Sequence, residues 1–138
     1  MVVPEPEVCR QIATERPFGK TRCGVIPGPV TPLEVARAFG LSDDVEIYTT
    51  VTSDEAAALV TYVLTTSLTF GGEEMKPSRA AELWQQFAAL FDEPVQFLTN
   101  CRSSDFCQFS PATDATIDLG VLVIGLANGG CLWVEDYD

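Results

Sequence analysis

The sequence contains no histidine and only two lysines among its 138 residues. Without histidine the chain lacks the commonest general base and the commonest catalytic metal ligand, so Ser-His-Asp and Cys-His hydrolysis are excluded. Lys20 and Lys76 lie in no motif that would activate a serine or threonine nucleophile. The glycines form neither a Walker pattern nor a GxGxxG turn, which argues against nucleotide binding. The sequence therefore predicts a protein that is not an enzyme and holds no cofactor.

Long hydrophobic runs are also missing. The longest apolar stretch, residues 120–127, is far shorter than the roughly 20 residues of a membrane-spanning helix, and it is typical of a buried strand. The first seven residues have neither the basic segment nor the apolar segment of a secretory signal. We expect a cytoplasmic protein that makes no contact with a membrane.

Positive charge is scarce and unevenly placed. The net charge is −12, with five basic and four acidic residues in 1–37 but three basic and sixteen acidic residues in 38–138. Such a chain repels nucleic acid and anionic membranes, and it attracts a basic protein and speeds the encounter with it. The alternative is that the acidic surface serves solubility alone.

The five cysteines are odd in number and contain no CxxC pair: Cys9, Cys23, Cys101, Cys107 and Cys131. Structural zinc sites use tightly spaced pairs, so this pattern predicts no metal site. Without a secretory signal, free thiols are expected. Cys101 and Cys107 could approach each other across a turn, but sequence does not decide whether they pair.

Helix signals recur along the first two thirds of the chain. Apolar residues at helical spacing predict a helix over 5–15, followed by an irregular Pro/Gly-rich connection over 17–32. Thr31, Pro32 and Glu34 form a capping box that starts the next helix, which Gly40 ends. Alternating residues over 45–51 predict a strand with one buried face. Further helices are expected from Ser53 and, with an apolar stripe, over 79–91.

The last third of the chain has strand signals. Strands are expected over 95–98 and 116–126, with a further short one over 106–109. Asn128 and Gly129 between apolar runs predict a tight hairpin turn, because both residue types accept positive φ. Residues 1–138 should thus form one α+β domain, with an antiparallel sheet, a C-terminal β-hairpin and three to four helices packed on it.

Acidic clusters are the candidate binding residues. None matches a calcium-binding loop, and several have structural explanations as helix starts or turns. Trp133 either packs in the core or, if exposed, joins the acidic end of the chain as a binding hot spot. The residues expected to contact a partner are Asp43, Asp44, Glu46, Glu73, Glu74, Trp133, Glu135 and Asp136.

The small size, the charge and the ending from Gly130 to Asp136 resemble the small acidic inhibitors of bacteria and phages, namely toxin-immunity and anti-CRISPR proteins. The resemblance is one of character, so no functional residue is carried over. It implies a non-enzymatic protein that binds and inhibits a basic partner, such as a toxin or a nucleic-acid-binding effector complex, without binding nucleic acid itself.

Two other functions remain open. One is a structural or adaptor subunit that joins a complex through an apolar patch near Trp84 or Trp133. The other is a small enzyme that uses carboxylates, Cys101 or Cys107. The terminal hairpin is also expected to leave an unpaired strand edge, through which two copies could form a homodimer.

Overall fold

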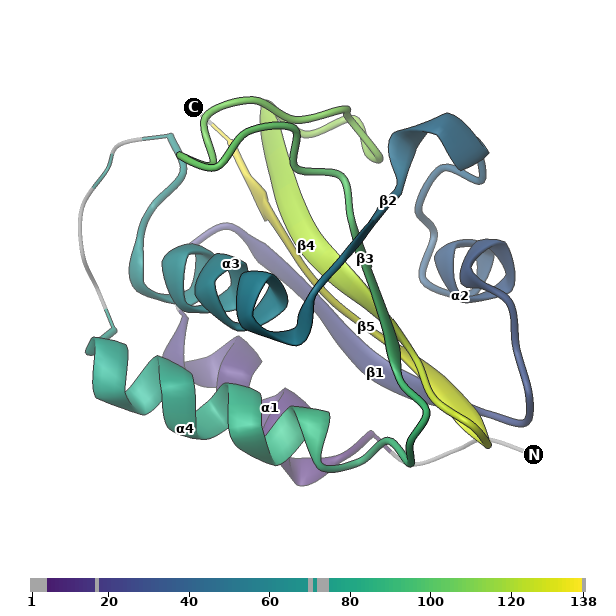
Figure 1. Ribbon diagram of the computed structural model, residues 1–138. Coiled ribbons are helices and arrows are strands. Elements are labelled where there is room, and N and C mark those ends of the chain that lie inside the picture. Colours follow the sequence, from purple (N-terminus) through teal and green to yellow (C-terminus); the bar gives the residue numbers. More distant parts are fainter. Residues whose placement is uncertain (1–4, 17, 70, 72–74, 138) are drawn as a thin grey trace.

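An antiparallel sheet frames the fold (Figure 1). The computed structural model describes residues 5–16, 18–69, 71 and 75–137, and within them five strands pair in the order β1-β5-β4-β3-β2. The strands are β1 (Lys20–Pro27), β2 (Thr49–Val51), β3 (Gln96–Thr99), β4 (Ile117–Ile124) and β5 (Asn128–Asp136). Every neighbouring pair is antiparallel.

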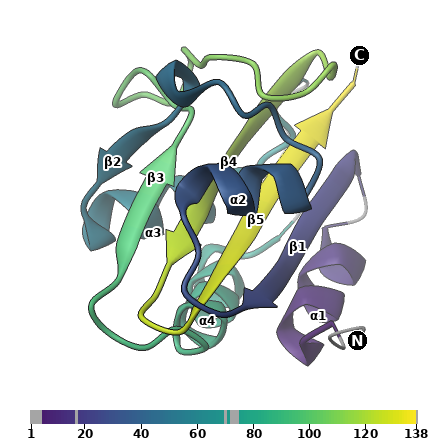
Figure 2. The same cartoon turned by 90° about the vertical axis from the view of Figure 1, so that its right-hand side faces the viewer.

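Helices cover both faces of this sheet. They are α1 (Glu7–Glu15), α2 (Pro32–Ala38), α3 (Ser53–Thr65) and α4 (Pro77–Ala88), with a 3₁₀ turn η1 (Val45–Ile47) before β2. Figures 1 and 2 show α1, α3 and α4 on one side and α2 alone on the other. Leu119 and Val134 point into the larger core under the three helices, whereas Leu122 and Trp133 point into the smaller core under α2. The predicted α+β fold with a terminal hairpin is confirmed.

Local capping signals start two of the helices. The Thr31 hydroxyl accepts from the Glu34 amide, and the Glu34 carboxylate accepts from the Thr31 amide, as predicted. Thr52 and Glu55 form the same reciprocal pair before α3, which begins at Ser53 as predicted. Each pair satisfies two backbone donors that a helix end would otherwise leave free.

The predicted irregular connection over 17–32 is wrong, because residues 20–27 form β1. The prediction rested on the high proline and glycine content of residues 17–32 as a whole. The prolines of this segment, however, lie outside the strand or at its last residue. Cys23 and Val25 pack against the larger core and Ile26 against the smaller one, so the strand does alternate. Pairing with β5 along its whole length supplies its backbone hydrogen bonds.

The strand predicted over 45–51 is only half correct. Residues 45–47 form η1, and only 49–51 form a strand. The Asp44 carboxylate accepts from the Glu46 amide at 3.0 Å, which favours a turn over an extended chain. As a result Val45, whose position in a strand would be inward, is exposed.

The terminal hairpin forms, but its turn lies two residues before the predicted one. Gly125 donates to the Asn128 carbonyl, and Ile124 pairs with Gly129, so Leu126 and Ala127 occupy the turn. Neither Asn128 nor Gly129 has positive φ. A Cβ on Gly129 would lie 2.5 Å from Val30, so this glycine is needed for close packing and not for turn geometry.

Two smaller expectations are also corrected. Residues 106–109 form no strand, since only an isolated bridge joins Cys101 to Phe109. The hairpin leaves no free edge, because β5 pairs on both sides and the edges are β1 and β2. Within the described residues, no helix is long and apolar enough to cross a membrane.

Candidate functional site

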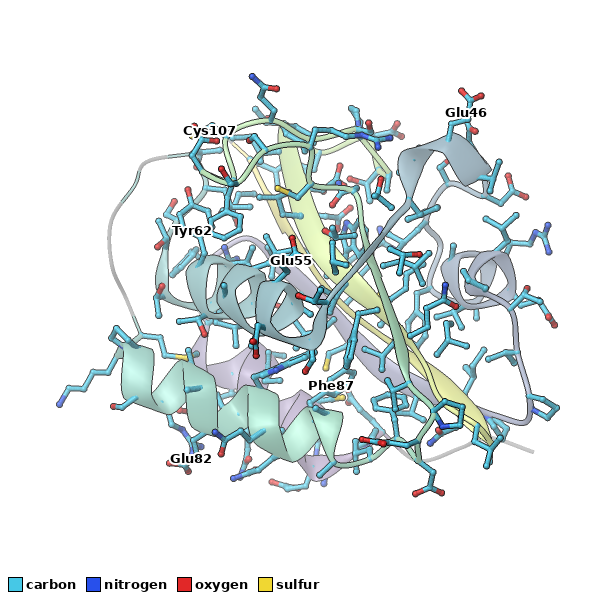
Figure 3. The ribbon with its side chains drawn as sticks, viewed as in Figure 1. Glu46, Glu55, Tyr62, Glu82, Phe87 and Cys107 are labelled. Atoms are coloured by element: carbon cyan, nitrogen blue, oxygen red, sulfur yellow. The ribbon has the colours of Figure 1, made fainter. Side chains whose placement is uncertain are left out.

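Three of the predicted contact residues gather on the segment between α2 and β2. Asp43, Asp44 and Glu46 are all exposed there, and Figure 3 shows Glu46 pointing away from the molecule above η1. Asp43 forms an ion pair with Arg37 at 3.0 Å, while Asp44 caps η1. The Glu46 carboxylate has no hydrogen-bond partner among the described residues, so it is the one most available to another molecule.

An exposed apolar side chain lies inside this acidic cluster. Val45 is 66% exposed between Asp44 and Glu46. It borders an apolar pocket of about 370 Å³. The other residues that line this pocket are Thr31, Pro32, Leu33, Tyr48 and Leu98. We call the pocket together with Asp43, Asp44, Val45 and Glu46 the η1 surface.

Arg102 fixes the η1 surface to the rest of the fold. Its guanidinium donates to the Glu46 carbonyl, to the Thr49 hydroxyl at 2.8 Å and to the Ser110 hydroxyl at 2.7 Å. These bonds tie η1, β2 and the loop before β4 together. Sequence reasoning missed both Val45 and Arg102, because each is recognised only once the turn and the neighbouring loop are in place.

Trp133 supports this surface from below and does not contact solvent. It is 0% exposed, and its ring meets Tyr48 edge to face with centroids 6.1 Å apart. Its indole N–H donates to Asp118 at 3.0 Å. Burial raises the pKa of Tyr48, whose hydroxyl donates to the Ser42 carbonyl. Of the two predicted alternatives for Trp133, the core position is therefore the correct one.

Asp118 organises the loop that borders this region. Its buried carboxylate accepts from Asn100, from the Ala112 amide and from Thr113, in addition to Trp133. Ala112 in turn accepts from the Ser42 amide at 2.9 Å. A continuous chain of hydrogen bonds thus runs from the sheet to the segment that carries the η1 surface.

Asp136, predicted as a partner-binding residue, is instead half of a buried ion pair. Its side chain is 3% exposed and that of Arg16 is 0% exposed. The two form parallel bonds of 2.8 and 2.9 Å. Arg16 also donates to the Val63, Phe18 and Thr66 carbonyls, and Asp136 accepts from the Leu68 amide. All five guanidinium N–H groups are satisfied, so the pair joins α1, α3 and β5.

Glu135 is likewise buried and structural. It accepts from Arg22 at 3.1 Å, and Arg22 donates to the Phe39 carbonyl at the end of α2 at 2.7 Å. A cation at a helix C-terminus interacts favourably with the helix dipole. Gly40 has φ +75°, a backbone conformation that favours glycine. A Cβ at this position would also lie 2.8 Å from the Arg22 guanidinium, so a larger residue would crowd that side chain.

Two predicted contact residues and one predicted adaptor contact are still to be placed. Glu73 and Glu74 lie outside the described residues. Trp84, named as a possible adaptor contact, is buried in the larger core against Phe87 and Phe97. Neither tryptophan therefore forms an exposed apolar patch.

The cysteine thiols of the 101–107 loop donate to backbone carbonyls of that loop. Cys101 lines a pocket of about 410 Å³ between β2, α3 and this loop. Its thiol donates to the Ser103 carbonyl, and that of Cys107 donates to the Asp105 carbonyl. Both are free thiols, and neither donates to a carboxylate. The loop packs on α3 through the ring of Phe106, whose centroid lies 4.9 Å from that of the Tyr62 ring.

Among the described residues, no three cysteine, aspartate or glutamate side chains gather closely enough to hold a metal ion. No protein-family model matches the chain, and neither a curated protein nor a solved structure is similar enough to count as a match.

Proposed function

We propose that the protein is a non-enzymatic inhibitor that docks its η1 surface onto a basic surface of another protein. The observation that carries the proposal is Val45, 66% exposed between carboxylates and beside an apolar pocket. An apolar centre with a charged rim is the usual composition of a protein-binding surface. Covering Val45 would contribute about 1–2 kcal/mol.

The distribution of ion pairs supports a basic partner. Five arginines, namely Arg10, Arg16, Arg22, Arg37 and Arg79, pair with carboxylates of the chain itself. Arg102 is engaged by backbone and hydroxyl oxygens. Most of the positive charge is therefore used internally, and the field felt by an approaching molecule is negative. Such a field speeds association with a basic protein and weakens as salt is added.

Inhibition would follow from occupation alone. The carboxylates of Asp44 and Glu46 can accept hydrogen bonds from arginine or lysine side chains that otherwise hold phosphates. Val45 and the neighbouring pocket would add an apolar contact, which provides affinity that salt does not screen. The partner class expected is a toxin or a nucleic-acid-binding effector whose basic surface is needed for its activity.

The test uses a matched pair of double variants as baits. Asp44→Asn/Glu46→Gln removes two charges from the η1 surface, and asparagine can still cap η1. Asp92→Asn/Glu93→Gln removes two exposed charges elsewhere. Each bait is incubated with a lysate of the producing cells, and bound proteins are identified by mass spectrometry at low and high salt. Purified partner is then titrated with each variant in an assay of the partner's own activity.

We expect the η1 variant to lose at least tenfold in affinity and in inhibition, with the control near wild type. Val45→Ser should weaken binding by a similar factor without changing its salt dependence. If both double variants bind equally well, the η1 surface is not the docking site. If a partner binds at the η1 surface but keeps its activity, the protein is a binder and not an inhibitor.

A second candidate function is an adaptor subunit, which the hairpin tip favours. Leu126 is 62% exposed and Leu90 is 39% exposed. The two lie at the same end of the molecule, where Asn128 donates to the Leu90 carbonyl at 2.9 Å. A partner bound there would resist high salt and would be lost with Leu126→Ser, whereas Val45→Ser would have no effect on it.

A further inference from the structure

Two cysteines from different elements face each other in the larger core. Cys9 lies on α1 and Cys23 on β1, and their sulfur atoms are 2.8 Å apart. Carbon atoms in van der Waals contact are about 3.5–4.0 Å apart, and sulfur is larger. A disulfide bond measures about 2.05 Å, so the two sulfurs need to approach by less than 1 Å.

We propose that Cys9 and Cys23 form a redox-active pair whose disulfide fastens α1 to the edge strand β1. The oxidant is a small disulfide of the glutathione class. A Cys23 thiolate attacks the glutathione disulfide, whose S–S bond breaks and releases one glutathione thiolate. A Cys9 thiolate then displaces the second glutathione from the mixed disulfide. The two protons lost by the protein thiols are taken up by the two released glutathiones, so one disulfide is exchanged for another.

The reaction requires α1 to move away from β1 for a short time. Cys9 is fully buried and Cys23 only partly exposed. Burial, and the neighbouring Cys9 thiol, raise the pKa of Cys23, so little thiolate is present in the closed fold. Exchange therefore starts while α1 is open or during folding. Closing of α1 then brings the sulfurs together and favours the protein disulfide.

The other cysteines are not positioned to compete. Cys131 is buried in the smaller core on the other face of the sheet. Cys101 and Cys107 lie on a loop beyond β3 and donate to backbone carbonyls of that loop. Cys9 and Cys23 are 14 positions apart in the sequence, so their bond would close a short loop. From loop-closure entropy, the melting temperature should rise by about 10 °C.

The experiment uses the full chain unfolded in urea and refolded with either glutathione disulfide or excess dithiothreitol. Free thiols are alkylated, and the protein is digested with trypsin without reduction. The expected product of the oxidised sample is a cross-link between the peptides 1–10 and 23–37, each of which contains one cysteine. Compared with the reduced protein, the intact oxidised protein should have a mass lower by two hydrogens before alkylation and a melting temperature higher by about 10 °C.

Two variants separate the pair from the other thiols. Cys9→Ala should make the melting temperature the same in oxidised and reduced samples, whereas Cys131→Ala should keep the difference. If peptides 1–10 and 23–37 of the oxidised wild-type protein are recovered separately and alkylated, the proposal is wrong. It is also wrong if the cross-link joins other cysteines. The wild-type peptide map decides this even if Cys9→Ala does not fold.

Discussion

Replacement of Asp136 by asparagine should destabilise the fold by about 3–5 kcal/mol. The carboxylate accepts from two guanidinium nitrogens of Arg16 at 2.8 and 2.9 Å and from the Leu68 amide at 2.6 Å. Asparagine keeps one acceptor but turns an N–H₂ donor toward one of these donors. At least one charge-assisted bond, of about 1.5–3 kcal/mol, is lost. The Arg16 side chain, 0% exposed, also keeps a charge without a counter-ion.

The assay is urea unfolding followed by tryptophan fluorescence, since Trp84 and Trp133 are both buried. The urea concentration at the unfolding midpoint should fall, while the dependence of the free energy of unfolding on urea concentration stays constant. This pattern indicates a change in stability and not in the compactness of the unfolded state. Asp92→Asn, at an exposed carboxylate, is the control and should change stability by less than about 0.5 kcal/mol. Removing both charges with Arg16→Met/Asp136→Leu should recover most of the loss, because no unpaired charge remains buried.

A loss below about 1 kcal/mol for Asp136→Asn would refute the reasoning, because pairs of that strength are typical of solvent-exposed charges. Asp136 would then have to be treated again as a solvent-exposed residue that can contact a partner. The folded fraction of Asp136→Asn should meanwhile bind a partner like wild type, in contrast to Asp44→Asn/Glu46→Gln. Stability and binding measured on the same samples therefore distinguish a structural carboxylate from a docking one.

Two further predictions follow from the described contacts. Arg102→Met removes the hydrogen bonds to Glu46, Thr49 and Ser110. It should lower partner affinity, measured by calorimetry, by about threefold to tenfold, while the free energy of unfolding falls by only about 1 kcal/mol. Unchanged affinity would show that η1 keeps its conformation without Arg102. Hydrogen bonding to Arg79 lowers the pKa of Glu15 below its ordinary value of 4.5. Because the unfolded chain binds this proton more tightly, the stabilisation is complete above pH 4.5 and is lost as pH falls through the lower folded pKa. Both side chains of the pair are about one-third exposed, so the contribution should be small. Glu15→Gln should flatten acid unfolding curves in that pH range, and curves identical to wild type would contradict this.

The parts of the fold that sequence predicted are those set by neighbouring residues. The capping pair of Thr31 and Glu34 and the apolar stripe of α4 involve residues a few positions apart. The edge strand β1 was missed because its pairing with β5 depends on residues far along the chain. In the sequence, the surrounding prolines outweigh the strand signal of Cys23, Val25 and Ile26. In the structure, the side chains of Cys23 and Val25 pack against the larger core and that of Ile26 against the smaller one.

The site was predicted in part for the same reason. Charge identified the exposed Asp43, Asp44 and Glu46, because clustered carboxylates are most often solvated. Charge alone could not show that Asp136 is buried, because its partner Arg16 lies 120 positions earlier in the sequence. Val45 was misplaced because strand alternation was assumed where Asp44 caps a turn.

The position of β5 between β1 and β4 also determines when the chain can fold during synthesis. Residues 20–27 are translated about 100 residues before residues 128–136, the one strand with which they pair in the described part of the chain. Until residue 136 has left the ribosome, β1 has no strand to pair with, and Cys23 and Val25 have no completed core. The nascent chain must therefore stay soluble with an unpaired β1, and arrays of such distant contacts fold slowly. Its scarcity of long hydrophobic runs and its excess of negative charge suit a chain that has to wait in this way.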